Sequence, residues 1–413
     1  MVQPGKTVPG GVPIVRVNNL KQGVIDIENI LTIDPAIAAM HRRTQLQGGE
    51  VLLSLVGSVG QTAIVPNELV GWNVARAIAV IPVIEEIGPK WIEICLRSAE
   101  IQRWITTRVT TTVQTTLNLG DVTLIPILIP PDDERLAITA IISELDDKIE
   151  LNRKMNQTLE EIARTIFTSW FVRFDPVRAK AAGRQPDGMD AETAALFPDA
   201  FVDSELGLIP AGWGVEKLAD VASLNTSLPL KKEQVAPYLD MANVPTQGSS
   251  AEELRDRPFG SGTRFQNGDV LLARITPCLE NGKTALVDFL DDGQIGWGST
   301  EFIVIRAKQP FGRVWAYCLA RDKAFRQFAI RSMSGTSGRQ RVSADAIGRY
   351  LIAKPTAEIA RRFEHLTEPL FESIRQHDLE SRTLRETRDV LLPKLLSGEI
   401  RVTLGREVVG ATA

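Results

Sequence analysis

The hydrophobic pattern along the chain predicts two very long helices. Apolar residues recur at spacings of mostly three and four from Leu136 to Trp170, and no Gly or Pro interrupts the stretch 132–174. A second stripe of the same kind begins near Ala357 and runs to Leu395. Each stripe covers about forty residues, or roughly 60 Å of helix. That length suits a two-helix coiled coil better than one face of a globular core.

One polar residue interrupts each stripe at a matching place, Asn152 in the first helix and His377 in the second. A polar side chain in a coiled-coil seam fixes the register of the helices at some cost in stability. We therefore interpret Asn152 and His377 as helix-register residues. A ligand or catalytic role for His377 is the alternative.

Short alternating runs precede each long helix and predict compact α+β heads. In the first head, Pro13–Val17 and Glu50–Leu55 are predicted strands, and Lys90–Arg108 is predicted to form one helix with an apolar face. The apolar run Ile125–Pro131 is expected to be extended, because its prolines forbid a helix there and lead into the long helix that follows.

The second half of the chain repeats the first half, in the same order, at a shift of about 225 residues. The matched segments are Gly49–Leu53 with Gly268–Leu272, Gly71–Val80 with Gly296–Ile305, and Asn118–Pro130 with Ser343–Pro355. One constant shift serves from Gly71 to Leu396. The chain is therefore expected to have two similar heads, which suggests that it binds two similar targets.

The repeat divides the chain into consecutive parts. They are a first head at 1–131, a long helix at 132–174, an irregular connector at 175–204 with one short helix at 191–196, a second head at 205–355, a second long helix at 356–397 and a tail at 398–413. The opening of the second head, Gly207–Trp213, has no counterpart in the first. Either the natural chain starts upstream of Met1, or the tail from Ser397 completes the first head in space.

Composition excludes several classes of protein. No run of eighteen apolar residues occurs, and the amino terminus has no apolar signal core, which argues against a membrane or secreted protein. Cys95, Cys278 and Cys318 are scattered, which fits reduced thiols in a cytoplasm. With three histidines in the chain, no metal site is expected.

The net charge of −4 conceals a segregation of charge along the chain. Fifteen basic residues stand against nine acidic ones between Leu254 and Tyr350, whereas the stretch 132–175 has six basic and ten acidic residues. The first head has ten basic and ten acidic residues, so its charges balance. A basic second head favours a polyanionic partner such as DNA. A solvated surface with patchy charge is the alternative.

The sequence lacks the motifs of the enzymes that it might otherwise suggest. There is no Asn/Asp-Pro-Pro-aromatic tetrapeptide of a methyltransferase, no dinucleotide-binding glycine fingerprint, no phosphate-binding loop with its lysine and no Ser/His/acid set. We interpret the chain as non-catalytic, without a cofactor of its own.

The tract Ser332–Val342 of the second head is the best candidate for contact with DNA. Small residues let the backbone approach a phosphate, arginine can neutralise phosphates or read guanine, and glutamine suits adenine. The candidates in the tract are Ser334, Thr336, Ser337, Arg339, Gln340 and Arg341. Further candidates in this head, chosen by residue type, are Arg274, Thr276 and Lys283. An ordinary surface loop is the alternative.

The equivalent tract of the first head, Arg108–Leu117, keeps the hydroxyls and one amide but lacks the arginines. Its candidate residues are Thr110, Thr111, Thr112 and Gln114, and weaker candidates in this head are Arg16, Asn18, Asn19 and Arg76. Two heads with one framework and different polar tips would read two different short sequences.

Four features of the chain occur together in one known family. They are Gly49–Leu53 with Gly57–Val65, the lead-in Leu128–Pro131, the long helices, and the terminal segment Leu391–Ile400. The connector Phe174–Lys180 is also typical of that family. On these features the chain resembles, over essentially its whole length, the specificity subunit of type I restriction-modification systems.

The resemblance implies an α+β fold of two tandem target recognition domains, each followed by a long helix, with the helices paired as an antiparallel coiled-coil spacer. It implies a non-catalytic cytoplasmic subunit that recognises a bipartite double-stranded DNA target with a fixed unread gap. The implied partners are two copies of an adenine methyltransferase subunit, which uses S-adenosylmethionine, and in some complexes a restriction and translocase subunit, which uses ATP and Mg. The competing hypothesis is a coiled-coil scaffold that joins two proteins without reading DNA.

Overall fold

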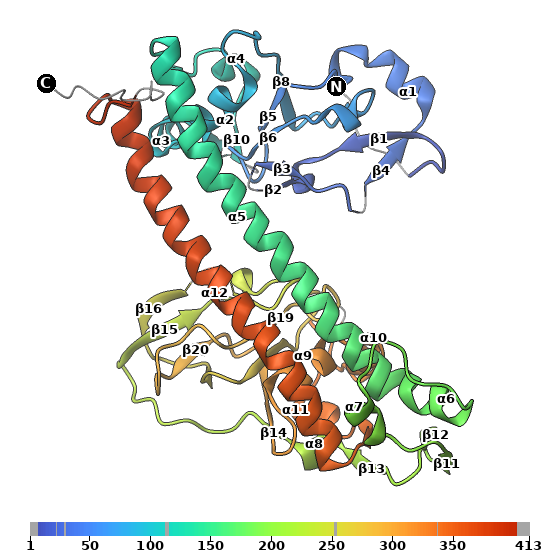
Figure 1. Cartoon of the computed structure of the whole chain (residues 1–413). Coiled ribbons are helices and arrows are strands. Elements are labelled where there is room, and N and C mark those ends of the chain that lie inside the picture. The colour runs from blue at the N-terminus through green and yellow to red at the C-terminus, as the bar shows by residue number, and fades with distance from the viewer. Residues whose placement is uncertain are drawn as a thin grey trace, which may run out of the picture. The chain divides into compact units, whose positions relative to one another are not determined.

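The computed structural model describes residues 7–21, 23–28, 30–111, 115–251, 254–336 and 338–402. The chain forms two compact units, of which unit 1 comprises Met1–Ile149 with Arg382–Ala413 and unit 2 comprises Glu150–Ser381. Two long helices, α5 (Asp132–Phe167) and α12 (Ala357–Leu396), each contribute residues to both units (Figure 1). The predicted α+β class with two long helices is confirmed.

The first long helix ends earlier than the sequence pattern predicted. From Thr168 to Arg173 the backbone forms a π-helix, and Phe174 adopts a left-handed conformation with a φ of 57°. A residue in this conformation ends a helix because its backbone leaves the hydrogen-bonding ladder. The predicted helix 132–174 is therefore α5 followed by a π-helical segment, which buries Trp170.

Head 1, the part of unit 1 at residues 1–131, contains two three-stranded sheets with the strand orders β4–β1–β7 and β6–β5–β8. The central strand β5 is fully buried and pairs antiparallel with both neighbours. The strands of head 1 are β1 (Val12–Val15), β2 (Leu20–Lys21), β3 (Val24–Ile25), β4 (Leu31–Ile33), β5 (Val51–Ser54), β6 (Thr62–Ile64), β7 (Asn73–Val74), β8 (Ile78–Ile81), β9 (Thr110–Thr111) and β10 (Thr115–Thr116).

The single helix predicted at 90–108 is wrong, because the chain forms two helices there. α2 (Pro89–Arg97) ends before Ser98, whose hydroxyl oxygen accepts a hydrogen bond from the Ile101 amide and begins α3 (Ala99–Arg108). Serine favours this position because its side chain satisfies an amide that has no partner within the helix. The other helical segments of head 1 are α1 (Pro35–Met40), α4 (Leu119–Val122), η1 (Val17–Asn19), η2 (Arg42–Thr44) and η3 (Asn67–Leu69).

Head 2, residues 205–355 of unit 2, contains two four-stranded sheets with the orders β14–β21–β18–β19 and β16–β15–β20–β17. Its strand β18 is fully buried between two antiparallel partners, as β5 is in head 1. The strands of unit 2 are β11 (Phe201–Ser204), β12 (Gly207–Pro210), β13 (Gly214–Lys217), β14 (Ala222–Leu224), β15 (Val235–Leu239), β16 (Leu254–Pro258), β17 (Thr263–Phe265), β18 (Val270–Ala273), β19 (Thr284–Leu286), β20 (Gly296–Gly298), β21 (Phe302–Ala307) and β22 (Leu351–Lys354).

The connector 175–204 is more regular than predicted. It begins with a helix, α6 (Asp175–Ala181), because Pro176 lies in the first turn, where proline starts a helix instead of breaking it. The short helix predicted at 191–196 is present as α7 (Ala191–Ala195), and β11 already pairs with β12 of head 2. The remaining helices of unit 2 are α8 (Leu218–Val221), α9 (Arg313–Arg321), α10 (Lys323–Arg331), α11 (Ala344–Gly348) and η5 (Met241–Asn243).

Strand pairing refines the internal repeat. Ser54 of β5 lies opposite Ile78 of β8, and Ala273 of β18 lies opposite Phe302 of β21. The central strands are thus related by 219 residues (54 to 273), as the match of Gly49–Leu53 with Gly268–Leu272 predicted, whereas their partners are related by 224 (78 to 302) and not by the predicted 225. A slip of one residue is hard to see in sequence here, because a strand buried on both faces has no polar face to mark its register.

The two long helices run antiparallel where they pair. In unit 2, Asn156 of α5 donates to Asp378 of α12 at 2.9 Å, and Phe167 further along α5 packs on Phe363, which lies earlier in α12. Residue numbers rise along one helix as they fall along the other. The predicted antiparallel pairing is confirmed.

Both long helices complete the core of head 1. Trp91 of α2 packs in one buried cluster with Ile138 of α5 and Leu392 of α12, and Ile400 and Val402 pack against the same cluster. The start of the predicted tail therefore lies against head 1. This agrees with the prediction that the tail from Ser397 completes the first head in space. Residues 403–413 of that tail lie outside the described residues.

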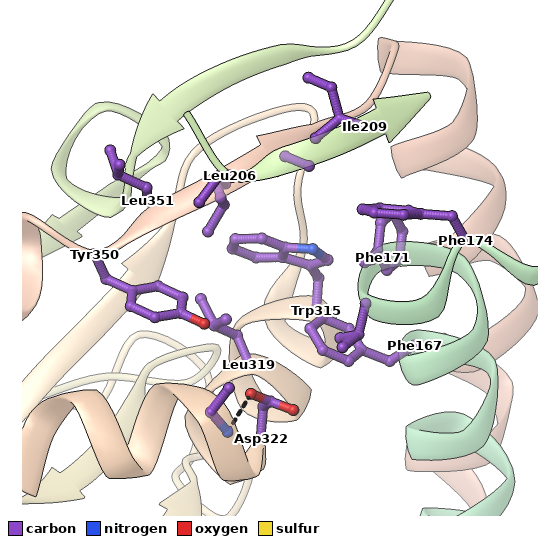
Figure 2. Close-up of a pocket in the computed structure, with 14 residues that line it drawn as sticks. Phe167, Phe171, Phe174, Leu206, Ile209, Trp315, Leu319, Asp322, Tyr350 and Leu351 are labelled. Carbon is purple, nitrogen blue, oxygen red and sulfur yellow. Dashed lines mark hydrogen bonds between the residues drawn. The ribbon is translucent and has the colours of Figure 1, made fainter. Parts of the chain in front are cut away.

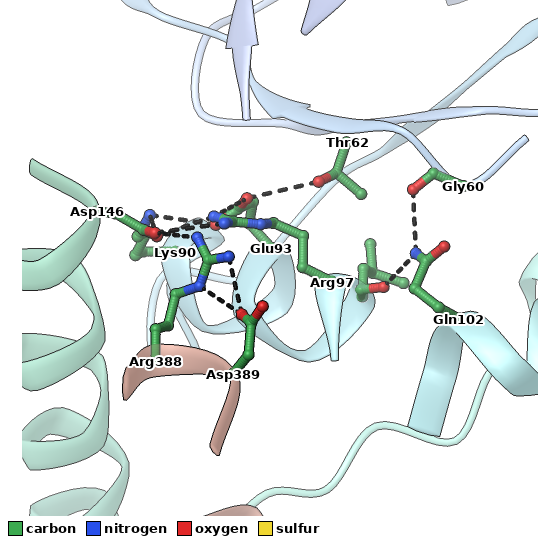
Figure 3. A network of polar contacts seen from close by, with 10 residues as sticks. Gly60, Thr62, Lys90, Glu93, Arg97, Gln102, Asp146, Arg388 and Asp389 are labelled. Carbon is green, nitrogen blue, oxygen red and sulfur yellow. Dashed lines mark hydrogen bonds and ion pairs between the residues drawn. The ribbon is translucent and has the colours of Figure 1, made fainter. Parts of the chain in front are cut away.

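An ion network joins head 1 to both helices within unit 1 (Figure 3). Asp146 of α5 accepts from Arg97 at 2.8 Å and Lys90 at 3.1 Å, both on α2, and from Arg388 of α12 at 2.8 Å. Glu93 pairs with the same Lys90 and Arg97. Burial alone would raise the pKa of Asp146, but the hydrogen bond and charge of Arg97, helped by Arg388 and Lys90, lower it to about 2.

Unit 2 combines polar contacts to the long helices with aromatic packing around a mostly apolar cavity of about 190 Å³ (Figure 2). Its lining includes Phe167 and Phe171, Trp315 of α9, Leu206 beside β12 and Tyr350 before β22. The indole nitrogen of Trp315 is buried without a hydrogen-bond partner. Head 2 is therefore held to the long helices by aromatic packing together with polar contacts, such as Arg313 to Glu368 at 2.8 Å and Tyr317 to Glu160 at 2.9 Å.

Candidate nucleic-acid interface

The polar tract of head 2 folds as a hairpin tip between α10 and α11. Ser334 and Arg341 exchange two backbone hydrogen bonds of 2.9 Å, and the Arg339 amide donates to the Thr336 carbonyl at 3.0 Å. Gly335 has a φ of 118°, which a residue with a side chain rarely adopts. The tip therefore exposes short polar side chains and Arg339 to solvent.

The hairpin is held by the segment that leaves β18. The Thr276 amide donates to the Gln340 carbonyl at 3.1 Å, and Ile275 forms a β-bridge with Arg341. The Val342 amide also donates to the Arg274 carbonyl at 2.9 Å. These bonds together gather five of the predicted residues, namely Arg274, Thr276, Ser334, Gln340 and Arg341.

Arg341 is paired with an acid that the sequence analysis missed. Its Nε lies 2.9 Å and its Nη2 lies 2.7 Å from Oε1 of Glu301, and Arg274 Nε lies 3.9 Å from the other carboxylate oxygen. The hydrogen bonds and charge of Glu301 raise the pKa of Arg341. Glu301 precedes β21 and is forty residues from Arg341, so only the folded sheet shows that they belong together.

Lys283 takes a different role from the one expected. Its ammonium group donates to the carbonyl oxygens of Met241 at 2.6 Å and Ala242 at 3.0 Å. It therefore ties the start of β19 to the η5 turn. Its charge is directed at that backbone and not at the hairpin.

Head 1 contains the equivalent hairpin. Thr111 of β9 lies opposite Thr115 of β10, and Thr110 lies opposite Thr116. The Thr115 carbonyl accepts from the Gly57 amide at 3.0 Å, so this hairpin is also held by the segment that leaves the central strand. Three predicted residues lie outside the described parts of the two hairpins: Thr112, Gln114 and Ser337.

The remaining candidates of head 1 lie elsewhere on it. Asn19 is 4% exposed; its side chain accepts from the Arg16 amide at 3.0 Å and donates to the Asp26 carbonyl at 2.9 Å, so it stabilises a turn. Asn18 and Arg76 are exposed. Within the described residues, no hydrogen bond joins Arg16, Asn18, Asn19 or Arg76 to the hairpin of β9 and β10.

A second group of polar and aromatic side chains in head 2 was not predicted from the sequence either, and two of its rings, Phe259 and Trp297, are buried. The rings of Tyr238 and Trp297 lie 4.5 Å apart, Arg257 lies 4.5 Å above Tyr238, and Arg264 lies 4.7 Å above the Phe259 ring. These side chains come from neighbouring strands of one sheet and from the loop after β16. No sequence motif links them, because the sheet alone brings them together.

The two predicted register residues lie in one polar layer between the long helices. Asn152 is fully buried, and its Nδ2 lies 2.7 Å from Glu380 Oε2, 3.2 Å from Ser381 Oγ and 3.3 Å from the His377 carbonyl oxygen. His377 Nδ1 lies 2.8 Å from Asn156 Oδ1. This layer is the polar break in the seam that the sequence pattern indicated.

The described residues offer few groups for chemistry. They contain no cluster of three His, Cys, Asp or Glu side chains able to hold a metal ion. No helix among them has the length and apolarity to cross a membrane. Burial raises the pKa of the Cys95 thiol to about 12 and that of Cys318 well above its usual value, so neither thiol is an activated nucleophile.

Comparison with known proteins finds similarity to one family. Residues 5–161 match the family model described as "Type I restriction modification DNA specificity domain". The chain is 26% identical to the HindI specificity subunit of Haemophilus influenzae, over 86% of this chain and 87% of that protein. It is 25% identical to the MjaIX specificity subunit of Methanocaldococcus jannaschii, over 66% of this chain and 60% of that protein.

Among solved structures, the chain is similar to a type I restriction-modification S subunit from M. genitalium. The two are 15% identical, with a TM-score of 0.49, over 96% of this chain and 91% of the other.

Proposed function

We propose, from the premise that this chain belongs to the family of type I restriction-modification specificity subunits, that its two heads read the two halves of a split DNA target. Specificity subunits are non-catalytic and direct partner enzymes. The chain needs no cofactor of its own, and its partners are DNA and a methyltransferase.

The observation that carries the proposal is the hairpin found in both heads. Each hairpin lies at the end of a buried central strand, held by the same backbone contact, between Gly57 and Thr115 in head 1 and between Thr276 and Gln340 in head 2. The frame is shared, but the side chains that it presents differ. A protein that reads two unlike half-sites needs this combination, because sequence is read by side chains at base edges.

The paired helices supply the second element of the proposal. We expect them to act as a spacer that sets the number of unread base pairs between the half-sites. Their acidic surface disfavours contact with phosphates and favours a protein partner. We expect two copies of an adenine methyltransferase subunit to bind, with S-adenosylmethionine on each, and ATP and Mg on any restriction subunit, in the cytoplasm.

The test is to map adenine methylation across the genome of a cell that expresses this chain with its methyltransferase subunit. Cells with the methyltransferase subunit alone are the control. A new methylated motif of two short halves with a fixed gap is expected. No new methylation from a complex shown to assemble would contradict the proposal and favour the scaffold hypothesis.

A further inference from the structure

The two hairpins share a backbone frame that matches bond for bond. In head 1, Leu55 N donates to the Ala77 carbonyl at 2.7 Å and Leu117 N donates to the Leu55 carbonyl at 2.9 Å. In head 2 the matching bonds run from Arg274 N to the Glu301 carbonyl at 3.0 Å and from Val342 N to the Arg274 carbonyl at 2.9 Å. A β-bridge completes both frames, between Val56 and Thr116 and between Ile275 and Arg341.

The matched positions carry uncharged side chains in head 1 and charged side chains in head 2. Head 1 has Leu55, Ala77 and Thr116, whereas head 2 has Arg274, Glu301 and Arg341. Head 1 forms the frame without any charge, so the frame does not need the three charged groups in order to fold. An exposed ion pair also adds little stability. The charged triad of head 2 therefore has a reason other than folding.

The triad fixes the direction of one guanidinium group. Glu301 takes the Nε and Nη2 hydrogens of Arg341, and Nη1 lies 3.3 Å from the Arg339 carbonyl, its acceptor. One hydrogen each on Nη1 and Nη2 then remains on the outer edge, because guanidinium carries five N–H groups. Two parallel donors of this kind match O6 and N7 of guanine in the major groove.

The Glu301 carboxylate favours a role of this site in reading bases over a role in attracting DNA of any sequence. A surface that only attracted phosphates would gain affinity by losing Glu301, because its negative charge repels DNA. Glu301 is 23% exposed beside the tip, with Arg274 at 3.9 Å as a second cation. Its presence is explained if orienting Arg341 matters more than that repulsion.

We infer that Glu301 is a positioning residue that holds Arg341 to read a guanine in the half-site of head 2, while the uncharged frame of head 1 reads its half-site without such a contact. This rests on the proposed function. The inference assigns guanine as a base read by head 2. It also assigns a role to Glu301, which lies outside the polar tract Ser332–Val342.

The test uses the chain assembled with its methyltransferase subunit and duplexes bearing the mapped motif or single base-pair changes in each half. With Glu301→Gln, we expect discrimination at one G·C pair of one half-site to fall about tenfold. Affinity for unrelated DNA should stay equal or rise, and the other half-site should be read as before. A merely structural loss would instead weaken all binding together.

Glu216→Gln is the matched control, since it removes another half-exposed carboxylate of head 2, paired with Lys354 at 3.3 Å, and should change nothing. Arg341→Lys should reproduce the loss at the same base pair, because lysine has no two-point donor edge. Unchanged discrimination in Glu301→Gln, with the parent complex discriminating normally, would overturn the inference alone. A parent complex that does not discriminate between duplexes would overturn the proposed function itself.

Discussion

At the scale of single residues, polar side chains divide into those used by the fold and those left for a partner. Lys283 and Asn19 are occupied by backbone groups of their own head. Arg341 is oriented by Glu301, and Arg339 has no side-chain partner in the described part of head 2. Residue type alone does not separate these cases, because the partners come from distant parts of the chain.

Replacing Arg339 tests the role of a free cation at the tip. Arg339→Ala should lower the affinity of the assembled complex for all DNA sequences by a similar factor and reduce the slope of log affinity against log salt by about one. Its discrimination between bases should change little. Titration of DNA at several salt concentrations measures both quantities, and an unchanged salt slope would place Arg339 away from DNA.

Asp288 gives the chain a pH dependence. It is 6% exposed, and burial raises its pKa to about 7, with the charge of Arg313 acting the other way and that of Asp378 adding to the rise. The folded chain then keeps a proton that the unfolded chain releases. The free energy of unfolding should therefore fall as pH rises from about 4 to about 7.

Asp288→Asn should remove the share of that slope that comes from Asp288 and leave the share from Glu364, whose pKa is also raised by burial to about 7. We expect the variant to exceed the parent in stability by roughly 1–3 kcal/mol at pH 8 and to match it near pH 4. Chemical denaturation at both pH values measures the difference. Asp291→Asn, which changes an exposed carboxylate nearby, is the control and should keep the slope of the parent. Equal stability of parent and Asp288→Asn at pH 8 would show that the buried carboxyl costs nothing.

At the scale of elements, the long helices do more than connect the heads. α12 contributes Leu392 to the core of head 1, and the Asp146 network ties α2 to both helices in unit 1. In unit 2, head 2 contacts α5 through aromatic rings such as Trp315, whose ring centroid lies 6.4 Å from that of Phe167. Each head is thus fitted to its own segment of the helix pair.

Removing Asp146 should loosen unit 1. Asp146→Ala leaves Arg97, Lys90 and Arg388 close together with one carboxylate fewer, and we expect a loss of about 2–4 kcal/mol. Glu150→Ala on the same helix removes only two surface ion pairs, with Arg153 and Lys154, and should cost less than about 1 kcal/mol. Similar losses for both variants, measured by chemical denaturation, would mean that the network contributes no more than a surface pair.

At the scale of the whole molecule, the proposed spacer role predicts a ruler. Removing one turn from each long helix shortens the pair by about 5.4 Å, or roughly one to two base pairs. The methylated motif should then have a gap shorter by that number, or methylation should cease. A gap of unchanged length would exclude the spacer role.

The sequence by itself determined the two long helices, the internal repeat, the lack of catalytic motifs and the resemblance to one family. These features depend on local periodicity and on the order of segments along the chain. Asn152 and His377 are examples, because each interrupts the apolar stripe of a single helix. Tertiary structure decided the rest: the pairing of Glu301 with Arg341, the occupation of Lys283, and the packing of Ile400 on head 1. The physical reason is that a strand slip or a contact across forty residues leaves the local pattern unchanged, yet it decides which side chains meet.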